Sequence, residues 1–198
     1  MKPITEISRR IGGYRPNLLP PGNGYTAAVA AILCERKGQV ELLFIERAKK
    51  TGDPWSGHIA FPGGRTEQED ADVAETARRE TREELGIDLN KATPLGRLDD
   101  VAAHIGPMNV SVFVYLMEAC DEFVYSDEVD QAFWFPLQKL ADSDRHTTFS
   151  VPGDCRNSNM PAIVLLGPGE TVLWGLTYRF VEQLVRLAGV SFPRSVSK

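Results

Sequence analysis

The most informative segment of the sequence is FPGGRTEQEDADVAETARRETREELGI, residues 61–87. It joins a paired glycine to a strongly charged segment, and a further glycine follows where a helix would end. We therefore predict a helix over residues 70–85. At about 100° per residue, Glu80, Glu83 and Glu84 fall within one arc of about 100° on that helix.

These carboxylates need a compensating partner, because like charges three and four residues apart on a helix repel one another. A neighbouring arc of small and apolar residues is expected to face the core: Ala74, Ala77, Thr81 and Leu85. The glutamates then lie at the edge of the buried face, where an unpaired charge is costly. Clustered hard oxygen ligands suit Mg²⁺ or Mn²⁺ rather than zinc. The alternative is a solvated face of nearly neutral ion pairs.

Length and composition indicate one globular domain. The chain has 198 residues, 42% of them hydrophobic and 25% charged, which is the ordinary range for such a domain. We expect residues 1–24 to form an N-terminal helix and loop, and residues 25–198 the core. The net charge of −5 argues against general nucleic-acid binding, which needs a basic face.

The same sequence predicts a cytoplasmic protein with no membrane partner. No apolar run approaches the roughly 20 residues that span a bilayer, and the N-terminus lacks the apolar region of a signal peptide. Cys34, Cys120 and Cys155 are widely spaced and form no CxxC pair. Reduced thiols are therefore expected rather than disulfides or a zinc site.

Periodic apolar residues predict the elements around the acidic helix. Ile4, Ile7 and Ile11 have the spacing of a short amphipathic helix. TAAVAAIL and VELLFIE flank a turn at Gly38, which predicts a β-hairpin. NVSVFVYLM alternates as a half-buried strand does, and QAFWFPL and PAIVLL are further strand candidates.

The chain is expected to close with a helix over residues 171–190. Its core-facing stripe would contain Leu173, Leu176, Phe180 and Leu184. Strands before and after a central helix, together with this closing helix, predict an α/β or α+β fold in which a mixed sheet lies between helices.

The opening stretch resembles the Nudix box, G-x5-E-x7-R-E-U-x-E-E-x-G-U, where U is a bulky apolar residue. Gly64 supplies the first position and RETREELGI, residues 79–87, the second half. Asp70 stands where the motif has its first Glu, Thr81 takes an apolar position, and the spacing from Gly64 to Arg79 is one residue longer. The extra residue leaves the role of Asp70 open. The resemblance implies a Nudix-type α/β/α sandwich with a mixed central β-sheet.

The resemblance also implies roles for the site residues. Glu80, Glu83 and Glu84 would hold Mg²⁺ or Mn²⁺, with the carbonyl of Gly63 as a further ligand, and Arg79 would orient a ligating glutamate. One carboxylate would act as general base, and Glu83 is the first choice. Glu128, in SDEVDQAFWFPL, resembles a later glutamate of the superfamily that touches metal or water; a charged loop residue is the alternative.

The loop before the box resembles the coenzyme A pyrophosphatase branch, L-L-T-x-R-[SA]-x3-R-x3-G-x3-F-P-G-G. Arg47, Ala48, Gly57 and residues 61–64 match, whereas Ile45 and Asp53 depart from it. The substrate-binding candidates are Arg47, Lys49, Trp55, Gly63 and Gly64. Trp55 would stack on a base or anchor the loop, and His58 and His104 are expected to be hydrogen-bonded loop residues rather than bases.

The hypothesis is a metal-dependent diphosphohydrolase that cleaves a nucleoside diphosphate linked to another moiety, with coenzyme A or its thioesters as substrates. ADP-ribose, another nucleoside diphosphate derivative or an NTP is the alternative substrate. Asp53 stands where the branch pattern has an arginine, and the loss of that cation would weaken binding of the extra 3′-phosphate of coenzyme A. The alternative from another class is a catalytically silent domain that only binds a nucleotide. By resemblance to the superfamily, a homodimer is possible.

Overall fold

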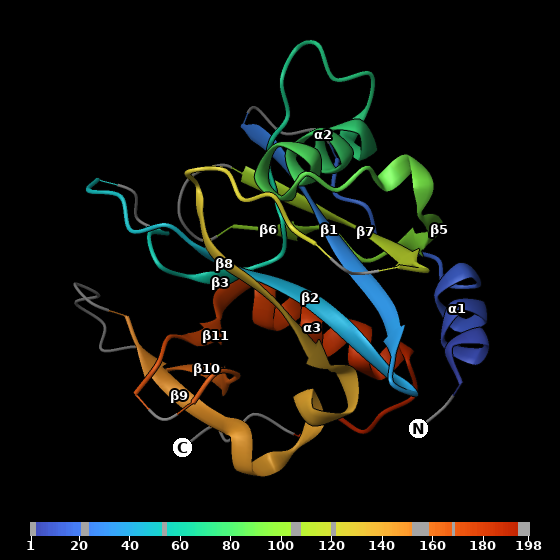
Figure 1. Ribbon diagram of the computed structural model, residues 1–198, viewed down its shortest axis with the longest axis vertical. Helices are drawn as coiled ribbons and strands as arrows, with labels where there is room; N and C mark the ends of the chain where they lie inside the picture. The colour runs from blue at the N-terminus through green and yellow to red at the C-terminus, as the bar shows by residue number, and fades with distance from the viewer. Residues whose placement is uncertain are drawn as a thin grey trace.

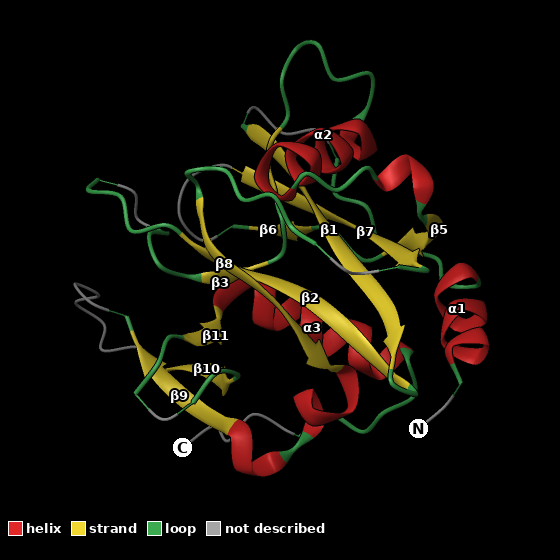
Figure 2. Cartoon of the chain, in the orientation of Figure 1, coloured by secondary structure: helices red, strands yellow, loops and turns green. Residues whose placement is uncertain are grey.

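The computed structural model describes residues 3–20, 24–52, 55–103, 108–119, 122–151, 159–167 and 169–193. Within these residues a large sheet lies between helices, and a small sheet stands beside it (Figure 1). Helix α2 (Val73–Leu85) covers one face of the large sheet, and α3 (Gly175–Leu187) lies on the other side. Helix α1 (Ile4–Gly12) packs at the edge (Figure 2). The predicted fold class is confirmed.

The described part of the chain places eight strands in the large sheet and three in the small one. The large sheet contains β1 (Tyr25–Arg36), β2 (Gln39–Arg47), β3 (Ile59–Ala60), β4 (Gly63–Arg65), β5 (Thr93–Arg97), β6 (Val101–Ala102), β7 (Met108–Met117) and β8 (Val129–Pro136). The small sheet contains β9 (His146–Ser150), β10 (Asn159–Val164) and β11 (Val172–Trp174). Short 3₁₀ turns occupy Leu89–Lys91, Leu137–Ala141 and Ser143–Arg145.

The large sheet is mixed, as predicted. Its main order is β3-β2-β1-β7-β5, while β4 pairs with β1, β6 with β7 and β8 with β2. Strands β1 and β7 run parallel, and the other pairs are antiparallel. The expected hairpin is formed by β1 and β2, and both turn residues, Lys37 (φ 48°) and Gly38 (φ 73°), have the positive φ that a tight two-residue hairpin turn requires.

Strand β1 is buried on both faces, because it lies between two hydrophobic clusters. Ala28, Ala30 and Ile32 pack toward α2 together with Ala77 and Leu85. The alternate residues pack into the cluster that contains Phe180 and Leu184 of α3 and Ile7 and Ile11 of α1. The short N-terminal helix is thereby confirmed.

Two sequence predictions about strands and helix ends were wrong. Strand β7 is not half-buried, since Ser111 and Tyr115 are buried as well as the valines between them, which is typical of a strand covered on both faces. The closing helix begins only at Gly175, which has a φ of 68° and follows strand β11. Leu173 therefore reaches the core from a strand, while Phe180 and Leu184 reach it from the helix.

The cysteine and membrane predictions met different outcomes. Cys34 is disulfide-bonded, so the expectation of three reduced thiols was wrong for this residue. Cys120 and Cys155 lie outside the described residues, as do Asp53 and His104. In the described ranges no helix has the length and apolar character needed to cross a bilayer.

Candidate active site

Helix α2 carries the acidic cluster, and its ends are defined by local chemistry. The side chain of Asp72 caps the N-terminus by accepting the N–H of Glu75 at 2.7 Å. Gly86, with a φ of 69°, ends the helix in the left-handed conformation that glycine adopts without strain. The helix therefore starts three residues later than predicted, and Asp70 lies before it, free to bond with another part of the site.

Glu84 is the most deeply buried carboxylate of the cluster, with 2% of its surface exposed. Its Oε2 accepts the N–H of Gly63 at 2.9 Å, which ties α2 to the glycine pair of β4. The pKa of Glu84 is raised to about 8, chiefly by burial and also by the charges of Glu80 and Glu128, while the Gly63 hydrogen bond and Arg47 oppose the shift. The negative charge at this position is thus destabilised unless a cation lies nearby.

Glu80 lies against the second glycine of the pair. A Cβ placed on Gly64 would overlap the Glu80 carboxylate, so the absence of a side chain at Gly64 makes room for it. Burial is the main cause that raises the pKa of Glu80, and the charges of Glu83 and Glu128 act in the same direction, against the effect of Arg79. The glycine pair therefore positions two glutamates, one by a hydrogen bond and one by close approach.

Arg79 connects the carboxylates of the box. Its Nε and Nη2 donate to the two carboxylate oxygens of Asp70 at 2.9 and 3.1 Å, and Nη1 donates to Glu80 at 3.0 Å and to Glu83 at 3.2 Å. Nη2 also donates to the backbone carbonyl of Arg65 at 3.0 Å. The Asp70 side chain is 2% exposed, and the Arg79 guanidinium holds its pKa well below the usual range. Arg79 has the geometry of an orienting residue.

The role that the sequence left open for Asp70 is explained by these contacts. Asp70 also accepts the hydroxyl of Thr76 at 2.9 Å and the N–H of Glu67 at 2.9 Å through its Oδ2. Despite the extra residue in the box, its carboxylate reaches Arg79 as a two-point partner. The position of Asp70, six residues after Gly64 as in the motif, was the available signal for this role.

A second acidic segment faces the helix from the loop before β8. Glu128 interacts electrostatically with Glu80 and Glu84, and its carboxylate lies 3.5 Å from Nζ of Lys50. Lys50 also binds Asp127 at 3.2 Å. The backbone N–H of Ala48 donates to the Glu128 carbonyl at 2.8 Å, which joins this loop to the end of β2. The contacts of Lys50 with Asp127 and Glu128 were not predicted from the sequence.

The remaining candidates line the loop between β2 and β3. Arg47 is close enough to Glu84 to lower its pKa, so it belongs to the cluster. The side chain of Lys49 passes over Gly57, where a Cβ would lie 3.4 Å from its Cε. Trp55 is partly exposed and its carbonyl accepts the N–H of His58 at 3.1 Å. The His58 ring packs edge-on against the Trp174 ring, with 4.9 Å between the two ring centres.

The donor chemistry of the cluster fits a hard divalent cation. Glu80 and Glu84 are partly or fully desolvated carboxylates, the charge of Glu80 raises the pKa of Glu84, and a cation would relieve their repulsion. In the ranges that the structure describes, however, no three His, Cys, Asp or Glu side chains converge as a ready-made metal cluster. Arg79 contacts Glu80 and Glu83 instead. Metal binding at Glu80, Glu83, Glu84 and the Gly63 carbonyl stays a prediction.

Gly64→Ala should separate the positioning of Glu80 from the fold. The added methyl group must displace the Glu80 carboxylate, which is the flexible end of a side chain, and the φ of Gly64 is not in the left-handed region. We expect kcat/KM for hydrolysis of the nucleoside diphosphate substrate to fall by about 10-fold or more. The concentration of Mg²⁺ needed for half-maximal rate should rise, while the thermal unfolding midpoint stays close to that of wild type. Gly167→Ala, which meets only a distant Glu170 atom, is the control. An unchanged Mg²⁺ dependence would contradict this role of Gly64.

A mixed sheet between helices, together with an acidic helix behind a glycine pair, defines the class of Nudix-type α/β/α sandwich proteins. The chain belongs to the NUDIX domain family, whose model matches residues 24–151. The chain is thus a Nudix hydrolase. Among solved structures it is similar to a MutT/nudix family protein from Enterococcus faecalis, with a TM-score of 0.58 and 18% identity over 86% of this chain and 65% of that one. At this identity the likeness concerns the fold alone.

Curated relatives point to the branch. The chain is 32% identical over 169 residues to the mitochondrial coenzyme A diphosphatase NUDT8 of Homo sapiens, which covers 82% of this chain and 69% of that protein. It is 36% identical over 98 residues to the peroxisomal coenzyme A diphosphatase ndx-8 of Caenorhabditis elegans, which covers 48% of this chain and 42% of that protein. The resemblance to the coenzyme A pyrophosphatase branch is consistent with these relatives. Because their names give organelles, the cytoplasmic location stays a prediction.

Proposed function

We propose that this chain hydrolyses the diphosphate of coenzyme A or its thioesters to a phosphopantetheine fragment and adenosine 3′,5′-bisphosphate, with Mg²⁺ or Mn²⁺. The observation that carries the proposal is the placement of Glu80 and Glu84 against Gly63 and Gly64, beside Arg47. The segment that contains these glycines and Arg47 resembles the coenzyme A branch except at Ile45 and Asp53, and two relatives carry that activity in their names.

The residues would divide the work as follows. Glu80, Glu83 and Glu84, with the carbonyl of Gly63, would hold the cation, which when bound neutralises diphosphate oxygens and acidifies water. Arg79 orients Glu80 and Glu83 through its shared guanidinium. Water adds to one phosphorus, the anhydride P–O bond breaks, and the proton of the water passes to a carboxylate, for which we propose Glu83.

Glu83 suits the role of base because it is the most accessible of the three clustered glutamates, Glu80, Glu83 and Glu84. Its side chain is 54% exposed, whereas Glu80 and Glu84 are held against the glycine pair. Glu128 is the second candidate, since it is half-exposed and close enough to Glu80 and Glu84 to raise the pKa of both. We propose that Arg47, Lys49 and Trp55 contact the substrate, and that residues 1–198 act as one domain.

A hydrolysis panel read by mass spectrometry tests the function. It contains coenzyme A, acetyl-coenzyme A, ADP-ribose, NADH, ADP-glucose and the nucleoside triphosphates, each with Mg²⁺ and with Mn²⁺. We expect coenzyme A to yield adenosine 3′,5′-bisphosphate. Cleavage of only ADP-ribose or the triphosphates would refute coenzyme A as the substrate. If no member is cleaved and no ligand changes the thermal unfolding midpoint with Mg²⁺, the diphosphohydrolase proposal is refuted in favour of a silent domain.

A further inference from the structure

An exposed arginine at the end of β4 lies over the ring of an exposed tyrosine. The guanidinium of Arg65 is 4.7 Å from the centre of the Tyr25 ring, and 62% of Tyr25 is accessible. A stack of this kind limits the rotamers of the arginine and leaves its in-plane N–H donors open to a ligand. We call Arg65 and Tyr25 the cation platform.

The cation platform adjoins the acidic cluster through the backbone. Arg65 directly follows Gly64, on which the Glu80 carboxylate packs. The carbonyl of Arg65 accepts a hydrogen bond from Arg79 at 3.0 Å, so the same guanidinium fixes both the glutamates and the base of the platform. Tyr25 begins β1 at the end of the strand that lies beside α2 (Figure 1). A substrate that binds with its diphosphate at the glutamates therefore lies close to the cation platform.

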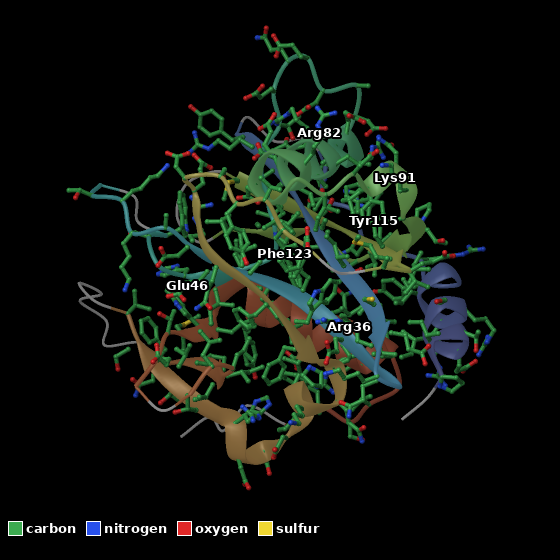
Figure 3. The ribbon with its side chains drawn as sticks, in the orientation of Figure 1. Arg36, Glu46, Arg82, Lys91, Tyr115 and Phe123 are labelled. Atoms are coloured by element: carbon green, nitrogen blue, oxygen red, sulfur yellow. The ribbon has the colours of Figure 1, made fainter. Side chains whose placement is uncertain are left out.

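The charge of Arg65 is available, in contrast to the charges of Arg79 and Lys50. Arg79 is neutralised by Asp70 and two glutamates, and Lys50 by Asp127 and Glu128. Within the part of the chain that the structure describes, Arg65 forms no ion pair with an acidic side chain. Figure 3 shows how densely polar side chains crowd this end of the molecule around Arg82 and α2. An unneutralised arginine beside three glutamates suits an anion that the glutamates themselves would repel.

We propose that Arg65, supported by Tyr25, recognises a phosphate monoester that the substrate carries in addition to its diphosphate. This inference rests on the proposed function, and the ribose 3′-phosphate of coenzyme A is such a group. A phosphate monoester carries nearly two negative charges at neutral pH and presents several oxygens, to which an arginine donates two parallel hydrogen bonds. Arg65 is thereby a specificity residue, and the chemistry at the diphosphate does not require it.

The test compares two substrates that differ only in this phosphate, coenzyme A and dephospho-coenzyme A. We expect Arg65→Gln to lower kcat/KM for coenzyme A by about 10- to 100-fold, mainly through KM, and to change dephospho-coenzyme A by less than about 2-fold. Tyr25→Leu should produce a smaller loss with the same selectivity, and Arg65→Lys should restore part of the affinity. Arg82→Gln, which removes one exposed charge from α2, is the matched control and should affect both substrates equally little.

A binding measurement separates this inference from the proposed function. Thermal shifts with adenosine 3′,5′-bisphosphate and with AMP report the phosphate preference without turnover. A preference for the bisphosphate that disappears in Arg65→Gln supports the inference even if wild type cleaves no coenzyme A, an outcome that would refute only the proposed function. Equal losses on both substrates, or a bisphosphate preference that persists in Arg65→Gln, would overturn the role of Arg65.

Discussion

Glu83→Gln is expected to lower kcat for coenzyme A by about 1,000-fold while the protein stays folded. A general base contributes about 10²–10⁴-fold to rate, and glutamine has nearly the same shape but cannot take up the proton. The side chain is 54% exposed, and its one hydrogen bond and ion pair among the described residues is with Arg79, so its loss should cost little stability. Single-turnover rates at saturating Mg²⁺ measure the chemical step.

The control is Glu75→Gln on the first turn of the same helix. Glu75 pairs with Arg78 at the surface, so its replacement should leave kcat within about 2-fold. Both variants are compared with wild type by thermal unfolding. Activity close to wild type in Glu83→Gln, with a native unfolding transition, would remove Glu83 from the mechanism, and Glu128→Gln would then be the next variant to measure.

The second large effect is expected on stability, from the pair of Asp70 and Arg79. Arg79→Gln leaves the 2%-exposed Asp70 carboxylate without its cation, and removal of one partner of a buried pair costs about 3 kcal/mol. Asp70→Asn should cost less, about 1 kcal/mol, because Arg79 keeps Glu80 and Glu83 as partners. The double variant should be more stable than the sum of the two losses predicts. Denaturant titration gives the three free energies of unfolding.

The Asp70–Arg79 pair also makes the free energy of unfolding depend on pH. Arg79 depresses the pKa of Asp70 in the folded state, so the ionised carboxylate stabilises the fold above the unfolded pKa of about 3.9. That contribution is lost as the pH falls through the folded value. The stability difference between wild type and Asp70→Asn should therefore be constant near neutrality and shrink below about pH 4.

The control for the stability loss of Arg79→Gln is Arg82→Gln, which should cost less than about 0.5 kcal/mol. A loss as large as that of Arg79→Gln would contradict a specific pairing of Asp70 with Arg79.

Loss of the Asp70 contact should also reduce activity, because Arg79 would no longer be held in one position. In both Arg79→Gln and Asp70→Asn the orientation of Glu80 and Glu83 is relaxed. The effect on kcat/KM is expected to be about 10–100-fold, the usual range for residues that orient metal ligands. If Asp70→Asn loses stability without any loss of activity, its role is structural alone.

Much of the fold could be predicted because it depends on local periodicity. The hairpin followed from two apolar runs around Gly38, and the acidic helix from its spacing and the glycine that ends it. The helix start was misplaced because Asp70 and Asp72 are both good capping residues, and only the structure shows that Asp72 accepts the helix N–H. The closing helix was predicted too long because an apolar strand and an apolar helix turn cannot be told apart over three residues.

The family, the arc of Glu80, Glu83 and Glu84, and the glycine pair behind them could be predicted from the sequence alone, since side-chain directions within one element follow from its period. The folded structure was needed to show which of these glutamates is buried, that Asp70 reaches Arg79, and that Arg65 lies over Tyr25. Each of these depends on the distance between separate elements. The packing of the whole chain sets those distances, and no local spacing encodes them.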